Sequence, residues 1–344
     1  MLIIFMTSSN KFNCPVCGNN SYKILYEVTN EQSAKHFIPN QSSKKYTQLS
    51  QHLLKLWGKN KCQVLECQNC GFGYANPYMG GDKIFYDLAY QRTGYPKWKF
   101  EFEETFNSIS KIIENTIIDS NSQLNFLEIG AGDGSFTKKI LSKLPSTRIT
   151  ATEYSEYGIE QLKKMGITVY PIDFRQKSEE WSQKFSIVCL FQVLEHLDNM
   201  EFTFNVLNSI TKNKAHLFIS VPNQKFINFN ESNGALLDMP PNHIGRYNKK
   251  TFELIAEKFG WTINDYKVED SDFELFLNKF TLYKYLRDIQ NDNTIENFLS
   301  KNKIIKKISL PFRLYYLKIK FKKLIFENYK EVGGSALWVH LMKN

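Results

Sequence analysis

One glycine-rich segment constrains the fold of this 344-residue chain more than any other feature. An apolar run at 124–129 leads into Gly-Ala-Gly-Asp-Gly at 130–134, and a helix-like pattern follows at 135–144. A strand that turns through glycines into a helix gathers free backbone N–H groups at the positive end of a helix dipole. This arrangement is typical of a parallel sheet that binds a nucleotide-like cofactor at its strand ends.

The flanking residues alternate between strand and helix patterns, which predicts an α/β fold with a doubly wound, Rossmann-like sheet. The run at 185–191 is almost entirely apolar, as expected for a central strand that is buried on both faces. Further strands are expected at 148–152, 168–172, 216–221, 261–268 and 333–342, and helices at 98–118, 157–165, 200–211 and 248–259.

The acid that follows the second strand of this region supports a cofactor site. Glu153 stands where a carboxylate can accept hydrogen bonds from ribose hydroxyls. The dinucleotide pattern GxGxxG would need glycine at position 135, where this chain has Ser135. A dinucleotide-binding domain with a degenerate fingerprint is therefore the less favoured alternative.

On the segment ExGxGxG at 128–134, residues 96–270 and the last strand resemble the class I S-adenosylmethionine-dependent methyltransferases. The resemblance implies a seven-stranded sheet and S-adenosylmethionine as cofactor. It places the glycines against the amino-acid part of the cofactor, Glu153 at the ribose and Asp173 at the adenine amine. The implied cofactor-binding residues are Glu128, Gly130, Gly132, Gly134, Glu153, Asp173 and Gln192.

Gln192, Glu195 and His196 follow the central strand, whose carboxyl end faces the ligand crevice. The sequence Val-Leu-Glu-His at 193–196 resembles that of methyltransferases that act on small molecules, including quinones and sugars. Some quinone O-methyltransferases hold a metal here with a glutamate in place of Gln192. Glutamine is a poorer ligand for hard cations, so we expect no catalytic metal. Glu195 and His196 are predicted either to be catalytic or to support the start of a helix.

The loop at 238–247 contains a second candidate base, His243, after a Pro-Pro step. Histidine titrates near working pH and can take a proton from a hydroxyl. The loop resembles that of the sugar C-methyltransferases, which implies that His243 is catalytic. Asn242 stands where that family has glutamate, so oxygen methylation is favoured over carbon methylation. The alternative is that His243 caps the helix that begins near Asn248.

Two CxxC pairs, Cys14 with Cys17 and Cys67 with Cys70, predict a four-cysteine structural zinc site in a subdomain at 1–95. Cys62 lies outside both pairs, and Cys189 lies inside the apolar central strand, where it is expected to be a core residue. A zinc module beside a methyltransferase domain at 96–344 again resembles methyltransferases of sugar and surface-polysaccharide pathways.

The net charge of +9 is concentrated at 301–330, which contains ten Lys or Arg and the single acid Glu327. We expect 270–330 to be a helical insertion before the final strand, with Pro311 dividing the basic part into two short helices. A solvated basic face packed on the core is the favoured interpretation. Contact with an anionic membrane surface, a phosphate-bearing substrate or RNA is the alternative.

The apolar start at 1–6 lacks a basic region and a cleavage site, so no signal peptide is expected. Paired cysteines used for metal fit a reducing compartment. We therefore expect a cytoplasmic enzyme, peripheral at the inner membrane surface if the basic segment binds lipid.

The predicted activity is methyl transfer to a sugar-derived or other small hydroxyl acceptor. An RNA methyltransferase and a zinc-ribbon binding protein with a vestigial core are the competing hypotheses, and the sequence does not predict the oligomeric state.

Overall fold

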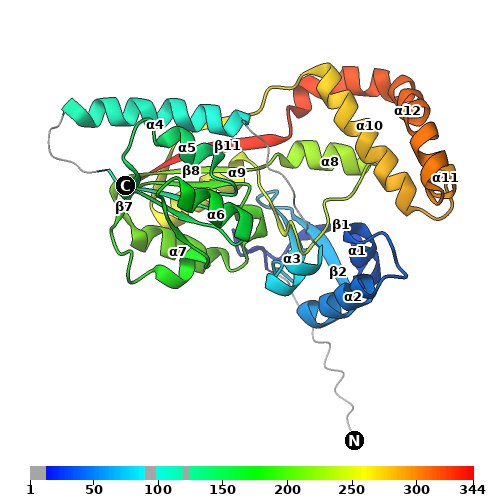
Figure 1. Cartoon of the computed structure of the whole chain (residues 1–344), viewed down its shortest axis with the longest axis horizontal. Helices are drawn as coiled ribbons and strands as arrows, with labels where there is room; N and C mark the ends of the chain where they lie inside the picture. Colours follow the sequence, from blue (N-terminus) through cyan, green and yellow to red (C-terminus); the bar gives the residue numbers. More distant parts are fainter. Residues whose placement is uncertain (1–12, 90–97, 119–123) are drawn as a thin grey trace, which may run out of the picture.

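The computed structural model describes residues 13–89, 98–118 and 124–344. The predicted apolar start at 1–6 and the predicted domain boundary near residue 95 lie outside these ranges. A seven-stranded sheet forms the centre of the larger lobe (Figure 1). Its strands are β4 (Phe126–Ile129), β5 (Ile149–Thr152), β6 (Thr168–Tyr170), β7 (Phe185–Phe191), β8 (Thr211–Pro222), β10 (Trp261–Val268) and β11 (Ala336–Lys343).

The spatial order of the strands is β10-β11-β8-β7-β4-β5-β6, and β11 runs antiparallel to both of its neighbours. The remaining neighbours pair in parallel. The predicted seven-stranded, doubly wound sheet is therefore confirmed. The chain passes from β4 outward to β5 and β6 and then returns to β7 on the other side of β4. Because the strand order reverses between β4 and β7, their carboxyl ends open into a crevice.

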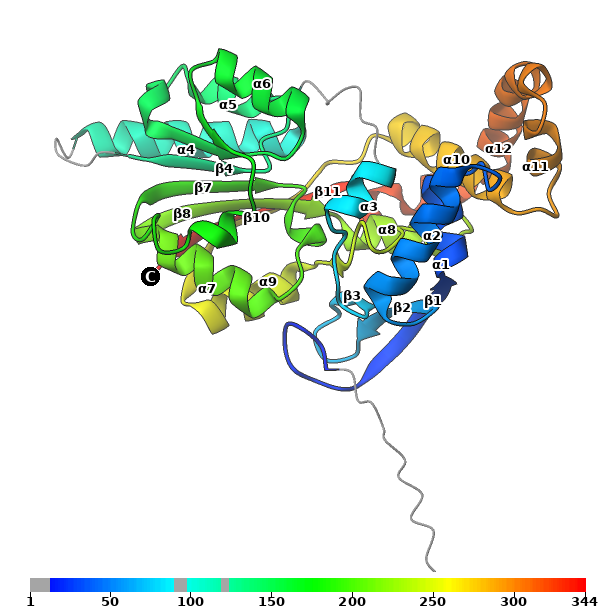
Figure 2. The same ribbon diagram turned by 60° about the horizontal axis from the view of Figure 1, so that its bottom comes forward.

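Helices cover both faces of this sheet, as Figure 2 shows. One face carries α4 (Phe100–Ile118), α5 (Ser135–Ile140) and α6 (Glu156–Lys164), and the other carries α7 (Met200–Ile210) and α9 (Lys249–Phe259). Short 3-10 helices are η1 (Ser146–Arg148), η2 (Phe174–Lys177) and η3 (Leu194–His196).

The central strand β7 is buried at every position, as its composition predicts. Ile187 and Cys189 pack with the α4 and α5 side, whereas Val188 and Leu190 pack with the α7 and α9 side. Cys189 is fully buried, which confirms that it is a core residue. Side chains that alternate between two apolar layers fix the register of this strand.

The N-terminal unit is an antiparallel sheet in the order β1-β2-β3-β9, covered by helices. Its elements are β1 (Tyr22–Thr29), α1 (Asn30–Phe37), α2 (Lys44–Trp57), β2 (Lys61–Cys67), β3 (Gly73–Asn76) and α3 (Lys83–Ala89). The fourth strand, β9 (Gly245–Arg246), comes from the loop after β8 rather than from the N-terminus. The two sheets are therefore joined by the chain segment that contains His243.

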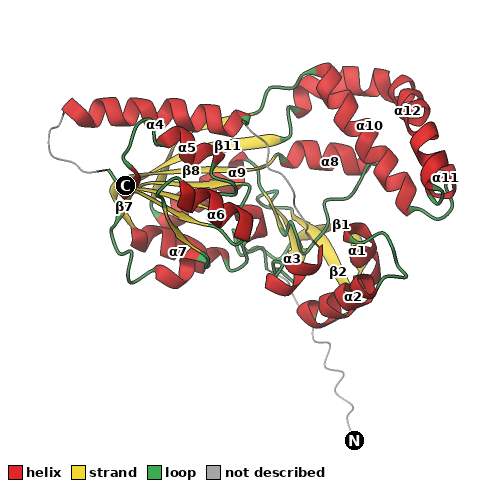
Figure 3. Cartoon of the chain, in the orientation of Figure 1, coloured by secondary structure: helices red, strands yellow, loops and turns green. Residues whose placement is uncertain are grey.

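Helices form the end of the molecule beyond β11 (Figure 3). They are α8 (Gln224–Ser232), α10 (Phe273–Gln290), α11 (Ile295–Ser300) and α12 (Lys303–Val332). The last three are inserted before β11, as predicted. Pro311 does not divide the basic segment: α12 continues through it. The φ angle of proline fits a helix. Two residues after Pro311, Arg313 pairs with Glu296 of α11, which holds this part of α12 in place. No described helix combines the length and apolarity that a bilayer-spanning segment needs.

A buried ion pair fastens the β9 segment to α8 and to the N-terminal unit. The Arg246 guanidinium is 2% exposed and contacts both carboxylate oxygens of Glu231 at 2.7 and 2.8 Å. It also donates to the Tyr26 hydroxyl at 2.9 Å and to the Asp238 carbonyl oxygen at 3.3 Å. These contacts connect β1, α8 and the loop before His243.

Replacing Arg246 tests this junction. Arg246→Ala leaves the Glu231 carboxylate buried without its partner, which we expect to lower the free energy of unfolding by about 3–5 kcal/mol. Arg246→Ala/Glu231→Ala removes both charges and is expected to recover part of the loss. Urea unfolding followed by circular dichroism measures both variants. If the free energy of unfolding of Arg246→Ala lies within about 1 kcal/mol of wild type, the proposed role of the pair is contradicted.

Candidate functional site

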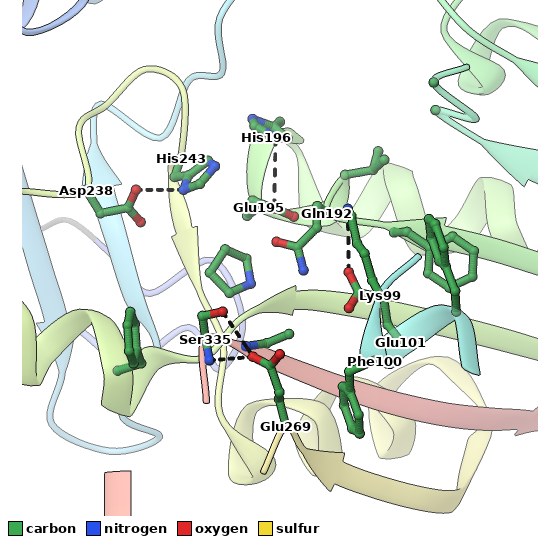
Figure 4. A pocket seen from close by; sticks show the side chains of 18 of the residues that line it. Lys99, Phe100, Glu101, Gln192, Glu195, His196, Asp238, His243, Glu269 and Ser335 are labelled. Atoms are coloured by element: carbon green, nitrogen blue, oxygen red, sulfur yellow. Dashed lines mark hydrogen bonds and ion pairs between the residues drawn. The ribbon is translucent and has the colours of Figure 1, made fainter. Parts of the chain in front are cut away.

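A cavity of about 1260 Å³ lies at the carboxyl ends of β4, β5, β7 and β8. Its walls also include Lys279 and Tyr283 from α10 and His36 from α1. A drug-sized ligand occupies a pocket of roughly 300–1,000 Å³, so this cavity has room for a cofactor together with an acceptor. Figure 4 shows the polar side chains that converge in it.

The predicted glycine loop lies at one end of this cavity. Gly130 and Gly132 line it, and both have positive φ angles, 71° and 57°. The backbone N–H groups of Gly130 and Ala131 donate to the carbonyl oxygen of Thr152 at 3.0 and 2.9 Å, which ties the loop to β5. Gly134 is the N-cap of α5 and does not line the cavity. A side chain there would press on Leu162, so this glycine serves close packing.

Glu153 lines the cavity at the end of β5, as predicted. Its carboxylate accepts hydrogen bonds from the backbone N–H groups of Gly132 and Ser155, each at 2.7 Å. Gly158, which the sequence reasoning missed, supports the same contact from α6. A Cβ atom at Gly158 would lie 2.3 Å from the Gly132 carbonyl oxygen and 2.8 Å from Cγ of Glu153. No sequence motif indicates that Gly158 lies against the glycine loop.

The other two predicted acids occupy different environments. Glu128 borders the cavity but is buried, and it accepts a hydrogen bond from the Thr137 hydroxyl. Burial raises the pKa of its carboxyl to about 8. Asp173 is not among the cavity-lining residues. Its carboxylate binds Arg175 at 2.6 Å and caps η2, and Arg175 also contacts Asp198 at 3.2 Å.

Gln192, Glu195 and His196 all line the cavity where β7 turns into η3. Gln192 has a φ angle of 57°, and its amide donates to the Ser220 hydroxyl at 3.4 Å. Glu195 is fully buried, and within the described residues neither of its carboxylate oxygens has a hydrogen-bond partner. Burial raises the pKa of Glu195 to about 7. Its Oε1 lies 3.8 Å from Nε2 of His196.

His243 reaches the same cavity from the other side, as Figure 4 shows. Its Nδ1 lies 2.6 Å from the Asp238 carboxylate, and its ring centroid is 4.8 Å from that of His196. Burial is the largest single influence and lowers the pKa of His243, but the charge and the hydrogen bond of Asp238, together with the charge of Glu195, outweigh it and hold the pKa above the ordinary 6.5. His243 does not cap α9, because the Asn248 side chain accepts the hydrogen bond from the Thr251 N–H.

Asp238 is the cavity-lining residue that the sequence reasoning overlooked. It stands five positions before His243, with Pro240 and Pro241 between them. An acid beside a candidate base was the available signal, but only the folded loop shows that the two side chains meet. With Nδ1 occupied by Asp238, Nε2 is the nitrogen that His243 has available for a ligand.

Among the residues that the structure describes, two groups of side chains have the composition and spacing to hold a cation. The ligand atoms of Glu195, His196 and His243 lie within 4.8 Å of one another. The prediction that no catalytic metal binds here is not tested by this proximity.

The four predicted cysteines form the second group, and their sulfur atoms lie within 4.8 Å of one another. The Sγ atoms of Cys14 and Cys70 are 3.6 Å apart, and those of Cys17 and Cys67 are 3.5 Å apart. Zn–S bonds of about 2.3 Å in a tetrahedron separate the sulfurs by roughly 3.8 Å, so the arrangement fits zinc. Cys62 is buried in a different cluster, beside Val28 and Leu53.

The comparisons with known proteins agree with this geometry. Residues 98–265 match the family model described as a methyltransferase domain. A malonyl-[acyl-carrier protein] O-methyltransferase of Acetivibrio thermocellus is 25% identical over 126 residues, covering 34% of this chain and 44% of that protein. A second protein of that name, from Ilyobacter polytropus, is 23% identical over 193 residues, covering 54% of this chain and 70% of that protein.

A solved methyltransferase from Archaeoglobus fulgidus, described as SAM-dependent, is 19% identical, with a TM-score of 0.39. It covers 71% of this chain, and 99% of that structure is matched. The strand order, the glycine loop at the strand ends and the family match together assign the core of the molecule. Residues 98–265 are therefore a methyltransferase domain of the class I, S-adenosylmethionine-dependent kind.

Proposed function

We propose that this protein transfers a methyl group to a hydroxyl of a small, sugar-derived acceptor, in glycan or surface-polysaccharide synthesis. The observation that carries the proposal is the contact between His243 and Asp238, at 2.6 Å, in the cavity that also contains the glycine loop. A histidine whose second nitrogen is held by a carboxylate is oriented to accept a proton at Nε2.

S-adenosylmethionine, when bound, supplies a methyl group on a positively charged sulfur. Gly130 and Gly132 allow the backbone to approach its amino-acid part, and the Glu153 carboxylate is placed for the ribose hydroxyls. Asp173 is proposed to meet the adenine amine from its place after β6, where its carboxylate also pairs with Arg175 at 2.6 Å. Gln192 lines the same cavity at the end of β7, and we expect its amide to orient the reacting groups.

Methyl transfer to a hydroxyl requires three coordinated changes. The acceptor oxygen forms a bond to the methyl carbon, the bond from that carbon to sulfur breaks, and the hydroxyl proton passes to Nε2 of His243. Asp238 stabilises the positive charge that develops on the imidazole. His196 lies beside His243 in the cavity, with 4.8 Å between the ring centroids, and the buried Glu195 carboxylate lies 3.8 Å from Nε2 of His196.

The acceptor class is inferred from the lining. Asn230, Glu269, Lys279 and Glu101 add amide, carboxylate and ammonium groups to the walls, which suits a polyhydroxylated ligand. The curated relatives named O-methyltransferases support oxygen as the acceptor atom. Carbon methylation of a sugar remains the runner-up, because the Asn242 side chain cannot act as the base that such a reaction needs.

A carboxylate acceptor, as in the named relatives, is the second candidate. A carboxylate is already ionised at neutral pH and needs no base. The two candidates therefore differ in how strongly they depend on His243.

The four-cysteine cluster is proposed to hold a structural zinc ion. Four thiolates leave no open position for a substrate. β3 follows Cys70 closely and pairs with β9 through Gly73 and Tyr74, so the zinc site also stabilises the segment after His243.

Gly158→Ala tests the cofactor site without touching the cofactor. The new methyl group would displace the Gly132 carbonyl oxygen and Glu153, so we expect the affinity for S-adenosylhomocysteine to fall at least tenfold. Gly166→Ala is the matched control, because it strains a backbone with φ 73° but meets only Ser146 at 3.7 Å. Isothermal titration calorimetry on both variants measures the difference. Equal affinities would contradict the assignment of this loop.

His243→Ala tests the proposed base. For a hydroxyl acceptor we expect kcat to fall roughly 100- to 10,000-fold while S-adenosylhomocysteine still binds. Activity within a few-fold of wild type would instead favour a carboxylate acceptor or another base.

The pH dependence tests Asp238. His243 must be neutral to accept a proton, so kcat/KM should rise with pH through an apparent pKa above 6.5. Asp238→Asn removes the charge that raises this pKa, so the rising limb should move to lower pH while the plateau falls. A profile with an unchanged limb would show that another group titrates.

Zinc removal tests the structural site. Metal analysis should find one zinc ion per chain, lost in Cys70→Ser and kept in Cys62→Ala, since Cys62 lies outside the cluster. We expect the zinc-free protein to bind S-adenosylhomocysteine nearly as well as wild type but to lose methyl transfer, because the His243 loop loses its support from β3. Full activity without zinc would contradict this coupling.

A further inference from the structure

The helix α12 has two apolar faces, and only one of them is covered. Leu317, Ile325 and Val332 are buried against the rest of the molecule, and Ile325 and Val332 pack with Phe280 of α10. The opposite side carries a second row of large apolar residues, each 60–72% exposed. We call this row the exposed stripe, and its members are Ile304, Ile308, Phe312, Tyr315, Ile319 and Phe326.

From Ile304 to Ile319 the members of the stripe follow one another at intervals of three or four residues, which places them on one side of a helix. Phe326 stands on the same side, one heptad after Ile319. From Ile304 to Phe326 it is about 33 Å long at 1.5 Å per residue. Large exposed apolar patches on proteins mark interaction surfaces. Figure 2 shows α11 and α12 at the end of the molecule away from the seven-stranded sheet, where a partner has access.

Charge identifies the kind of partner. Lys318 borders the stripe on one side and Lys323 on the other, because helix positions repeat every 3.6 residues. Lys322 lies in line with the stripe between Ile319 and Phe326, and Lys320 lies farther around the helix beyond Lys323. The segment 301–330 contains ten basic residues and the single acid Glu327, which lies 3.9 Å from Lys323. An apolar row edged by lysines matches an anionic lipid surface, where apolar side chains enter the acyl boundary and the lysines meet phosphates.

A second copy of this chain fits the stripe less well. Ile308, Phe312, Tyr315 and Ile319 have the spacing of a coiled-coil seam, but Lys322 continues that seam and Lys318 and Lys323 flank it. Two such helices would bring like charges together with almost no acids to compensate.

We propose that α12 docks this protein onto anionic membranes through the exposed stripe and its bordering lysines. The helix lies on the surface rather than crossing it, in agreement with the absence of any spanning segment among the described helices. α10 connects this surface to the cavity, because Phe280 packs against Phe321 of α12 at 5.0 Å between ring centroids, while Lys279 and Tyr283 line the cavity. The proposal does not depend on the identity of the acceptor.

Vesicle sedimentation tests the proposal with the full chain. Wild type should pellet with vesicles of phosphatidylcholine containing 30% phosphatidylglycerol, and added salt should weaken its binding. Lys318→Gln/Lys320→Gln/Lys322→Gln/Lys323→Gln should lower the partition coefficient at least tenfold. Lys44→Gln/Lys45→Gln/Lys55→Gln/Lys59→Gln makes the same charge change on and just after α2 and should stay within twofold of wild type.

The apolar part has its own pair of variants. Ile308→Ser/Phe312→Ser/Ile319→Ser should also lower binding at least tenfold, whereas Ile24→Ser/Ile84→Ser/Phe202→Ser, which removes exposed apolar groups elsewhere, should not. Unchanged S-adenosylhomocysteine affinity in each variant shows that the methyltransferase domain is folded.

Three results would overturn the proposal. The first is wild type that stays in the supernatant with anionic vesicles. The second is binding that the stripe variants retain. The third is tighter binding to an RNA oligonucleotide, or a dimer that the stripe variants disrupt, in place of binding to vesicles.

Discussion

The pairing of β9 with β3 is the constraint on which the proposed active site depends. Gly73 pairs with Arg246 and Tyr74 with Gly245, so the four-cysteine unit and the methyltransferase sheet share this segment. Ile244, next to His243, is held on both sides. Its N–H donates to the Glu195 carbonyl oxygen at 2.8 Å, and its carbonyl oxygen accepts from the Ala75 N–H at 2.9 Å. The backbone of one residue, Ile244, therefore connects η3, the His243 loop and the N-terminal sheet.

The same loop is held upstream of His243. Ser33 donates to the Pro240 carbonyl oxygen at 2.7 Å, and the Gly81 N–H donates to the Pro241 carbonyl oxygen at 3.0 Å. The Asn242 carbonyl oxygen contacts Nδ1 of His196. A catalytic loop gains precision when rigid elements on both sides fix its backbone. The N-terminal unit consequently positions the loop of His243, the proposed base, which belongs to the other lobe.

Local patterns in the sequence predicted the sheet well, because the apolar period and the glycine turn are properties of neighbouring residues. Phe185–Phe191 and Trp261–Val268 match their predicted strands residue for residue. The helices α1 and α2 were hidden in a polar stretch, since their buried residues are few and their caps, Thr29 and Ser43, are common in loops as well. Local composition is least informative where tertiary packing decides the conformation.

Long-range contacts account for what the sequence could not predict in the site. The cluster of four cysteines could be predicted because the CxxC spacing is typical of a shared metal ion. The approach of Gly158 to Gly132 has no such sequence pattern. Asp238 and His243 are close in sequence, but the folded Pro-Pro step decides that their side chains meet. The break predicted at Pro311 was wrong because a proline need not end a helix whose neighbouring turns have tertiary contacts, and Arg313, in the next turn, pairs with Glu296 of α11.

Burial and charge act against each other around His243, and the balance determines what the cavity can do. Glu195 is buried with a pKa of about 7, so near neutral pH it is divided between a charged and a neutral form. Its charge raises the pKa of His243, and the charge of His243 lowers that of Glu195. A proton that arrives at His243 therefore makes ionisation of Glu195 more favourable. Two carboxylates, Asp238 and Glu195, therefore stabilise the positive charge of a protonated His243. Neither of them has to contact the acceptor to do so.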